Sequence, residues 1–452
     1  MTVVVRPSAA THNFNAPTNI SDIQSSRETH LKVDSIVQFF EDHYKKIGND
    51  AIERNRRHQR MKERLENVPY EKREEFFQRF ISEETTYTRA MRTKFKAERY
   101  VRLKMIGRGG YGEVWLAGDT TTHELLALKV LKKAKLILDK QVTNVRSERD
   151  VLSISNNPWI VELKYSFQDQ EYLYLGLEFV QGGDLMGLLM NYQTFSPSWA
   201  AFYIAEIVLA INSVHKMGYL HRDLKPDNIL ICANGHIKLT DFGLATNYSK
   251  PEIDISLLIE QLNIEQNEDF SSIRKPHHKR NNNVQAFSID YAAPELLMGE
   301  KATTASDYWA LGVILYEMIY GCPPFYDQKQ KNVIKKILNW RTTLTFPSRQ
   351  NATVDAVDLM YHLLCEQSER YGFEQIISHP FFKDFDFDNP FLNTPPVTPT
   401  IKSPTDSSHF ENLEPTKDQT CGHIPLSDLA QFAFVGFTYK PRPANSILLS
   451  LQ

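Results

Sequence analysis

The stretch that most constrains this chain is His221-Arg222-Asp223-Leu224-Lys225-Pro226-Asp227-Asn228, which Asp241-Phe242-Gly243 follows. The two motifs supply two carboxylates, an ammonium group and an amide. These groups suit phosphoryl transfer: Asp223 can orient and deprotonate a hydroxyl, and Lys225 can hold the transferring phosphate. Asn228 and Asp241 can hold Mg²⁺. The first motif alone could arise by chance, but apolar runs typical of strands flank the second, so chance is a poor explanation for the pair.

A glycine-rich segment lies upstream and ends in residues typical of a strand. Its members are Ile106, Gly107, Arg108, Gly109, Gly110, Tyr111, Gly112, Glu113 and Val114. The spacing Gly-x-Gly-x-x-Gly is weak evidence by itself, because dinucleotide-binding folds place the same pattern before a helix. Here a strand-like run, 114–117, follows the glycines. This order favours a flexible hairpin that lies over the phosphates of a nucleotide.

The run Leu126-Ala127-Leu128-Lys129 is typical of a buried strand that carries one lysine. An ammonium group between apolar neighbours is costly to bury unless it is paired. We expect Lys129 to have two partners, the phosphates of ATP and an acid on the next helix, for which Glu148 is the best candidate. Glu178 is the competing acid, but it lies in a linker-like segment and is expected beside the adenine.

The composition excludes few classes of function. Lysine and arginine total 52 and aspartate and glutamate 55, and the net charge of -3 argues against attraction of the whole chain to nucleic acid or membrane. The four cysteines show no Cys-x-x-Cys spacing, so reduced thiols are expected rather than a disulfide or zinc site. No membrane insertion is predicted, because the N-terminus lacks the features of a signal peptide and the longest near-apolar run, 309–320, is too short to span a bilayer.

The N-terminal region divides into two parts by composition. Residues 1–32 are rich in Ser, Thr, Asn and Pro and are predicted to be a disordered leader. Residues 33–99 have the pattern of a charge-dense helical region with too little apolar surface for a core of its own. Charge patterning alone favours a solvated face, and the alternative is a basic docking surface for an acidic protein. Nucleic acid is disfavoured, because glutamates between the arginines would repel phosphates.

Seven motifs in a fixed order resemble the eukaryotic protein kinase family. They are 107–114, Lys129, Glu148, 221–228, 241–243, Ala293-Pro294-Glu295 and Asp307-Tyr308-Trp309. The resemblance implies an α+β bilobal fold, with a small β-rich lobe and a larger helical lobe, in a kinase domain over 100–382. Lys225 after the catalytic Asp resembles the serine/threonine class. The implied reaction is transfer of the ATP gamma-phosphate to Ser or Thr of protein substrates, with Mg²⁺ as cofactor.

The C-terminal part, 383–452, resembles the tail of AGC kinases, with a hydrophobic motif at 434–439 that docks on the small lobe. The tail, the basic N-terminal helices and a long insertion before Ala-Pro-Glu are similar to the NDR/LATS branch, above all to its fungal mitotic-exit and septation kinases. That resemblance implies a Mob-type adaptor at 33–99, which reverses the preference for a solvated face, and an upstream activating kinase. It also implies a role in cell division, septation or morphogenesis, in the cytoplasm, with the spindle pole or division site as candidate locations.

The resemblance assigns roles to single residues. Asp223 and Lys225 would be catalytic, and Asn228 and Asp241 would hold the metal. The nucleotide would be bound by Ile106, Gly107, Arg108, Gly109, Gly110, Tyr111, Gly112, Glu113, Val114, Ala127, Lys129, Glu148, Glu178 and Asp184. Asp184 and Asp227 would pair with a basic residue upstream of the acceptor, which predicts an Arg-x-x-Ser/Thr preference. Glu295 and Arg370 would form a buried pair.

The segment before Ala-Pro-Glu departs from the family. An insert at about 246–286 is expected either to hold the kinase inactive, as in relatives, or to be a flexible solvated loop. Aligned from upstream, Ser288 is the activating phosphosite, and the chain is then a few residues shorter than its relatives. Aligned backwards from Ala-Pro-Glu, Ser288 replaces the threonine that bonds the catalytic Asp and Lys. One serine cannot fill both roles, so Ser288 stays open between them; Thr438 is the second candidate phosphosite.

Two classes of function remain. The first is an active, adaptor-regulated serine/threonine kinase, and the alternative is a pseudokinase scaffold that binds partners without turnover. The shortened activation segment favours the scaffold slightly. The intact Lys129, Asp223, Asn228 and Asp241 oppose it, so we expect an active enzyme.

Overall fold

The computed structural model describes residues 27–92, 94–248, 288–414 and 431–440. The chain divides into two compact units, Met1–Arg60 and Met61–Gln452, and each is described by itself. Residues 1–26 of the predicted leader and 249–286 of the predicted insert lie outside the described residues.

Two long helices form the N-terminal region, α1 (Arg27–Glu66) and α2 (Arg73–Arg92). The prediction that a disordered leader extends to residue 32 is wrong for residues 27–32, because α1 begins at Arg27. Residues 27–32 contain no Gly or Pro, so nothing in them opposes continuation of the helix. Pro69 stands just before a 3-10 turn, Tyr70–Lys72, between the two helices, where the missing N–H of a proline is tolerated.

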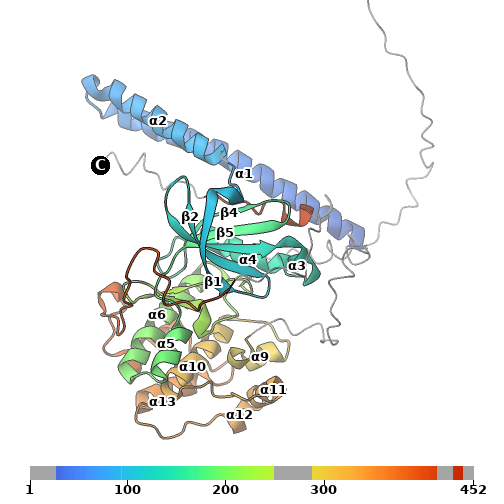
Figure 1. Cartoon of the computed structure of the whole chain (residues 1–452), viewed down its shortest axis with the longest axis vertical. Helices are drawn as coiled ribbons and strands as arrows, with labels where there is room; N and C mark the ends of the chain where they lie inside the picture. The colour runs from blue at the N-terminus through green and yellow to red at the C-terminus, as the bar shows by residue number, and fades with distance from the viewer. Residues whose placement is uncertain (1–26, 93, 249–287, 415–430, 441–452) are drawn as a thin grey trace, which may run out of the picture. The chain divides into compact units, whose positions relative to one another are not determined.

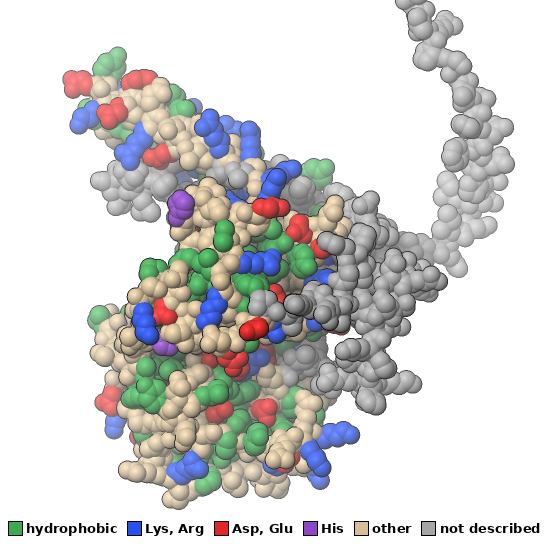
Figure 2. Space-filling view, in the orientation of Figure 1, with side chains coloured by type: hydrophobic (Ala, Val, Ile, Leu, Met, Phe, Trp, Pro, Cys, Tyr) green, Lys and Arg blue, Asp and Glu red, His purple; other side chains and the backbone are tan. Residues whose placement is uncertain are grey.

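Few side chains of α2 are buried. Phe80 is 2% exposed and Glu84 5%, and Met61, near the end of α1, is 7% exposed. Over α2, acidic and basic side chains are interspersed (Figure 2). The helix thus lacks the broad apolar face that a self-sufficient core requires.

A five-stranded antiparallel sheet forms the small lobe, in the order β1-β2-β3-β5-β4 (Figure 1). The strands are β1 (Tyr100–Arg108), β2 (Gly112–Asp119), β3 (Leu125–Lys132), β4 (Leu163–Gln168) and β5 (Tyr172–Glu178). Between β3 and β4 the chain forms the helices α3 (Lys133–Leu138) and α4 (Val142–Ile154). Alternate residues of β3 face opposite sides of the sheet. Ala127 and Leu131 therefore join the main core, while Leu126, Leu128 and Val130 join a separate aromatic cluster.

The large lobe is helical. Its helices are α5 (Leu185–Tyr192), α6 (Pro197–Lys216), α9 (Pro294–Leu297), α10 (Thr304–Tyr320), α11 (Gln330–Leu338), α12 (Trp340–Thr343), α13 (Val354–Leu363) and α14 (Phe373–Ile377). Two short hairpins accompany them, β6 (Tyr219–Leu220) with β9 (Thr246–Asn247) and β7 (Ile229–Ile231) with β8 (Ile237–Leu239). This lobe and the sheet lobe confirm the predicted α+β bilobal architecture.

Helix α6 is the one described helix long and apolar enough to cross a membrane by length and composition. The sequence prediction had instead singled out 309–320 as the longest near-apolar run. About two thirds of the apolar window in α6, 67%, is buried inside the protein. Its apolar character is accounted for by the core of the large lobe, which it shares with α10.

Candidate active site

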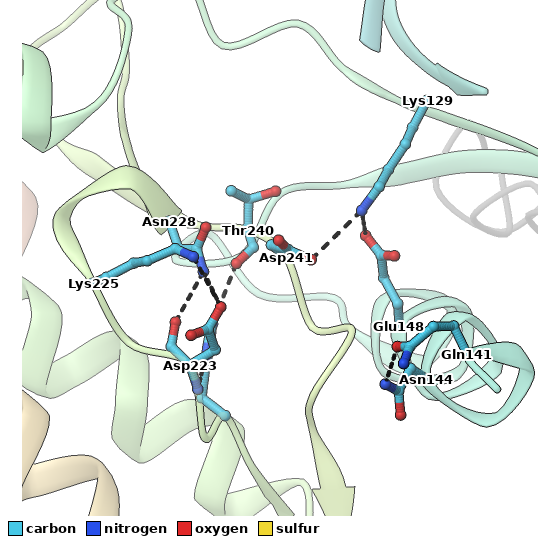
Figure 3. A network of polar contacts seen from close by, with 10 residues as sticks. Lys129, Gln141, Asn144, Glu148, Asp223, Lys225, Asn228, Thr240 and Asp241 are labelled. Carbon is cyan, nitrogen blue, oxygen red and sulfur yellow. Dashed lines mark hydrogen bonds and ion pairs between the residues drawn. The ribbon is translucent and has the colours of Figure 1, made fainter. Parts of the chain in front are cut away.

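Lys129 lies at the centre of β3, where its neighbours across the ladder are Val114 on β2 and Leu175 on β5. Its Nζ donates to Glu148 Oε1 on α4 over 2.7 Å and lies 3.5 Å from Asp241 Oδ1 (Figure 3). The predicted partner on the following helix is therefore present. Strand, helix and loop bring together three charges that are far apart in the sequence.

The electrostatics of this group favour a charged Lys129 and an ionised Asp241, whereas burial raises the pKa of Glu148. Burial lowers the pKa of Lys129, but the carboxylates of Asp241 and Glu148 outweigh burial and leave that pKa above its ordinary value. The neighbouring Lys129 ammonium holds the pKa of Asp241 below its usual range, against the effect of burial. A charged lysine beside an ionised Asp241 is the arrangement needed to bind phosphate and cation together.

Asp223, Lys225 and Asn228 form a second group on the catalytic loop (Figure 3). Lys225 Nζ donates to Asp223 Oδ2 over 3.1 Å. Asn228 Nδ2 donates to the Asp223 carbonyl over 2.8 Å and to Oδ2 over 3.3 Å. The Asp223 carboxylate is thus oriented from two sides by residues of its own loop.

Asp307 holds the backbone of that loop in place, a role that sequence reasoning did not assign. Its carboxylate accepts the N–H groups of His221 and Arg222 over 3.0 and 2.8 Å, and it contacts His215 Nε2 at 2.7 Å. Arg222 has a φ of 66°, a conformation that is costly for a residue other than glycine. The two hydrogen bonds that the Asp307 carboxylate accepts offset the cost of this backbone conformation. Only its place in the Asp-Tyr-Trp motif pointed to Asp307 in the sequence.

Ser288 contacts the catalytic loop directly. Its Oγ accepts a hydrogen bond from Lys225 Nζ over 2.9 Å, and its N–H donates to Asp223 Oδ1 over 3.3 Å. These contacts match the alignment counted backwards from Ala-Pro-Glu, in which the residue here bonds the catalytic Asp and Lys. A hydroxyl already engaged in this way supports that role over an activating phosphosite.

The glycine-rich segment forms the turn between β1 and β2. Gly109 N–H donates to the Gly112 carbonyl over 2.9 Å. A Cβ at Gly112 would lie 2.0 Å from the Val130 carbonyl oxygen, so only glycine fits beside β3. Two side chains of the segment are directed elsewhere: Arg108 donates to the Glu414 carbonyl in the tail, and Glu113 accepts from Trp115 Nε1.

The apolar members of this segment pack against the main core, as does Ala127 on β3. Ile106, Tyr111 and Val114 are partly buried against the main core, and Ala127 is buried within it. Burial raises the pKa of Tyr111, with the charge of Asp139 adding to the effect. The hairpin is therefore anchored to the main core by apolar side chains.

The side chain of Glu178 has partners within the protein, and its expected place beside an adenine stays a prediction. Its carboxylate pairs with Lys238 on β8 and accepts the Glu162 N–H over 2.8 Å. Any contact between Glu178 and an adenine would thus have to come from the main chain. No pattern in the sequence pointed to Lys238 as the partner, because the two residues are brought together only by the folding of β8 beside the end of β5.

Asp184 caps helix α5. Its Oδ1 accepts the Gly187 N–H over 2.8 Å. Burial raises the pKa of Asp184, and the nearby carboxylates of Asp227 and Glu411 raise it further. These three acids make a site of concentrated negative charge beside the catalytic loop.

The hydrophobic motif is docked on α4 and β4. The side chains of Phe434 and Phe437 are fully buried, whereas Thr438 is exposed. Arg146 donates to the carbonyls of Ala433 and Val435, and Arg149 to that of Gly436. The Ser166 hydroxyl donates to the Phe437 carbonyl over 2.7 Å. Main-chain carbonyls and two aromatic rings therefore carry the docking.

Two further predictions can be compared with the structure. Arg370 Nη1 donates to Glu295 Oε1 over 2.8 Å, and both side chains are buried, so the expected pair is present. Among the described residues the three cysteines are free; Cys421 lies outside them.

Lys129, Glu148 and Asp241 form one cluster, and Asp223, Lys225 and Asn228 form a second one on the catalytic loop. The model of the protein kinase domain family matches residues 100–382. The chain belongs to the protein kinase family.

Curated relatives define the branch. The chain is 36% identical over 450 residues to the serine/threonine-protein kinase CBK1 of Pneumocystis carinii. The matched region covers 92% of this chain and 88% of that kinase. It is 36% identical over 459 residues to a probable serine/threonine-protein kinase, ndrB, of Dictyostelium discoideum, covering 93% and 83%. It is 38% identical over 431 residues to the serine/threonine-protein kinase Warts of Drosophila melanogaster, covering 89% and 39%. It is a serine/threonine kinase of the NDR/LATS branch, as predicted, while the finer likeness to the fungal septation kinases stays a prediction.

Proposed function

We propose that this chain transfers the gamma-phosphate of ATP, with Mg²⁺, to Ser or Thr of protein substrates that carry an upstream arginine, under the control of an adaptor. The observation that carries the proposal is the cluster of Lys129, Glu148 and Asp241, which faces the Asp223–Lys225 pair. A pseudokinase scaffold would have no need of both groups, and no comparison favours one.

The residues present fit magnesium. Asn228 commits its Nδ2 to Asp223, which leaves its amide oxygen able to bind a cation, and Asp241 offers an ionised carboxylate. Oxygen ligands suit Mg²⁺, which keeps waters and phosphate oxygens as its other ligands. This fits the absence, among the described residues, of any larger cluster of His, Cys, Asp or Glu arranged to hold a metal. When bound, the ion supplies neutralisation of charge on the phosphates.

The protein residues divide the remaining work. Lys129, held by Glu148, grips the phosphates of the nucleotide. Asp223 orients the acceptor hydroxyl and accepts its proton, and Lys225 stabilises negative charge on the transferring phosphoryl group. The hydrogen bond of Ser288 fixes the Lys225 ammonium beside Asp223. These positions are set before substrate binds, so little reorganisation is needed during transfer.

The substrate preference rests on the acids beside the catalytic loop. Asp184, Asp227 and Glu411 lie close enough for the latter two to raise the pKa of the first. A guanidinium group placed among them would relieve their repulsion and form charge-assisted hydrogen bonds. On a peptide array, arginine upstream of the acceptor is expected to increase phosphorylation; an array with no gain from arginine contradicts the preference.

Regulation is proposed by resemblance and supported by the shape of the N-terminal region. Helices that bury few of their own side chains are suited to a partner, here a Mob-type adaptor at 33–99. An upstream kinase would modify exposed Thr438, and the enzyme would act in cell division, septation or morphogenesis, in the cytoplasm or at the spindle pole or division site. A pull-down with residues 33–99 tests the adaptor: capture of a Mob-type protein supports it, and its absence with a folded bait opposes it.

Transfer itself is tested with radiolabelled ATP. Wild-type protein is compared with Asp223→Ala, each with and without adaptor. Label on the peptide that disappears in Asp223→Ala supports the enzyme, whereas equal label in both proteins, or none in either despite nucleotide binding, supports the scaffold.

A further inference from the structure

The tail crosses the large lobe over the turn between β7 and β8. Gly235 in that turn has a φ of 90°. A Cβ added there would lie 2.6 Å from Pro395 Cβ and 2.6 Å from the Val397 carbonyl oxygen. Carbon atoms that are not bonded do not approach so closely, so the tail backbone rests directly on the main chain of the turn.

The next residue of the turn, His236, contacts a second point of the tail. Its ring centroid is 5.2 Å from that of Phe391, in an edge-to-face arrangement. The other neighbour of Phe391 is Trp159, stacked at 4.6 Å. Aromatic pairs in these geometries are stabilising beyond the area they bury. Phe391 is therefore held between the turn and the loop that precedes β4.

The turn itself is fixed from within the core. Glu206 on α6 is fully buried, and its carboxylate contacts His236 Nδ1 and accepts the Ile237 N–H over 3.0 Å. A turn held in this way can act as a rigid support for the tail.

The same tail continues past the segment that connects the lobes and reaches β1. A Cβ at Gly182 would lie 2.7 Å from Pro399 Cγ. Gln181 Nε2 then donates to the carbonyls of Ser403 and Pro404, each over 3.0 Å. Lys104 on β1 donates to the Ser407 carbonyl over 3.3 Å. The tail thereby joins the strand before the glycine-rich turn to the connection between the lobes.

We propose that Gly235 and His236 are positioning residues for nucleotide binding that act through the tail. They fix the place of residues 391–397, and this fixes residues 403–414, which hold β1 and Arg108 of the glycine-rich turn near the connection between the lobes. The inference rests on the proposed function, because it concerns the ATP site. Gly235 has no side chain, and the side-chain hydrogen-bond partner of His236 is Glu206 rather than a residue of the active site.

The test uses Gly235→Ala in the full-length chain. The control is Gly299→Ala, which introduces the same backbone strain without a steric clash. Gly299 has a φ of 78°, and no atom lies within 4 Å of a Cβ added there. Gly235→Ala is expected to raise the KM for ATP about three- to tenfold with kcat little changed, as for the loss of a modest binding term. Gly299→Ala is expected to leave the KM within about twofold of wild type.

A double-variant cycle with Phe391→Ala identifies the route. If both changes act by freeing the tail, Gly235→Ala with Phe391→Ala raises the KM no more than the larger single change. Hydrogen exchange at residues 391–411 should be faster in both single variants and unchanged in Gly299→Ala. The proposal would be overturned if the fold increases in KM of the two single variants multiplied in the double variant. It would also be overturned if hydrogen exchange became faster while the KM for ATP stayed unchanged.

The outcome stays separate from that of the proposed function. Nucleotide affinity is also measured directly with a fluorescent ATP analogue, and Asp223→Ala accompanies every transfer assay. Loss of the difference between wild type and Asp223→Ala would refute the kinase function, whereas unchanged nucleotide affinity in Gly235→Ala would refute only the role of the turn.

Discussion

Replacing Ser288 with alanine removes one hydroxyl from the catalytic loop and leaves the backbone contact in place. In the wild-type chain Lys225 Nζ donates to Ser288 Oγ over 2.9 Å and to Asp223 Oδ2 over 3.1 Å. The Ser288 N–H separately donates to Asp223 Oδ1 over 3.3 Å. Ser288→Ala therefore loses only the restraint that holds the ammonium group beside the catalytic carboxylate.

The size of the effect follows from that one bond. A hydrogen bond to a charged group contributes about 1.5–3 kcal/mol. If the bond acts fully in the transition state, kcat falls by roughly 10- to 150-fold, since about 1.4 kcal/mol corresponds to a factor of ten. The KM for ATP should change little, because Ser288 contacts the catalytic pair rather than Lys129 or Asp241. Ser288→Thr keeps the hydroxyl and is expected to retain most of the activity.

The assay measures kcat and KM with a peptide that carries an upstream arginine, before and after phosphatase treatment. Ser288→Asp should be inactive, because a new carboxylate would face Asp223 and repel it. If Ser288 were instead the activating phosphosite, Ser288→Asp would stay active, and phosphatase would still inactivate an enzyme whose other candidate site is removed by Thr438→Ala. Either of these results, or full activity in Ser288→Ala, refutes the reasoning.

Three further predictions concern stability and the tail. Arg370→Ala leaves Glu295 buried without its cation and should cost about 3–5 kcal/mol in urea unfolding; an equal loss added by Glu295→Gln in the double variant would argue against a coupled pair. Burial raises the pKa of Glu206 to about 8 from an ordinary 4.5, so the unfolded chain ionises first and wild-type stability falls as pH rises between these values. Glu206→Gln should remove that slope from thermal unfolding, and an unchanged slope contradicts the assignment. Phe437→Ala should lower the activity of phosphatase-treated enzyme more than Thr438→Ala does, because the ring is buried and the threonine is exposed; the reverse order would show that the threonine dominates docking.

Some pairings could be predicted from the sequence because chemistry leaves few alternatives. A lysine in an apolar strand needs an acid, and the nearest acid on the next helix was Glu148, which is the observed partner. The pair of Glu295 and Arg370 was instead predicted from the resemblance to protein kinases, and it is present in the structure. No partner was predicted for Glu178, and its pairing with Lys238 became visible only in the fold, because the two residues are 60 positions apart.

Ser288 is a residue whose role could not be decided from the sequence. Counting along the chain gives two alignments that differ by a few residues, and both are consistent with the motifs. Only the fold shows that its hydroxyl reaches Lys225, because that contact joins two loops that are 63 positions apart.

The sequence by itself determined the class of chemistry, the order of the motifs and the residues that bear charge at the site. These follow from residue type and spacing, since phosphoryl transfer requires a base, cations and oxygen ligands. The tertiary structure alone decided that Asp307 holds the catalytic loop, that Ser288 bonds Lys225, and that Gly235 supports the tail. Such contacts depend on the directions of side chains and on the space between segments that are distant along the chain, and no local pattern encodes either.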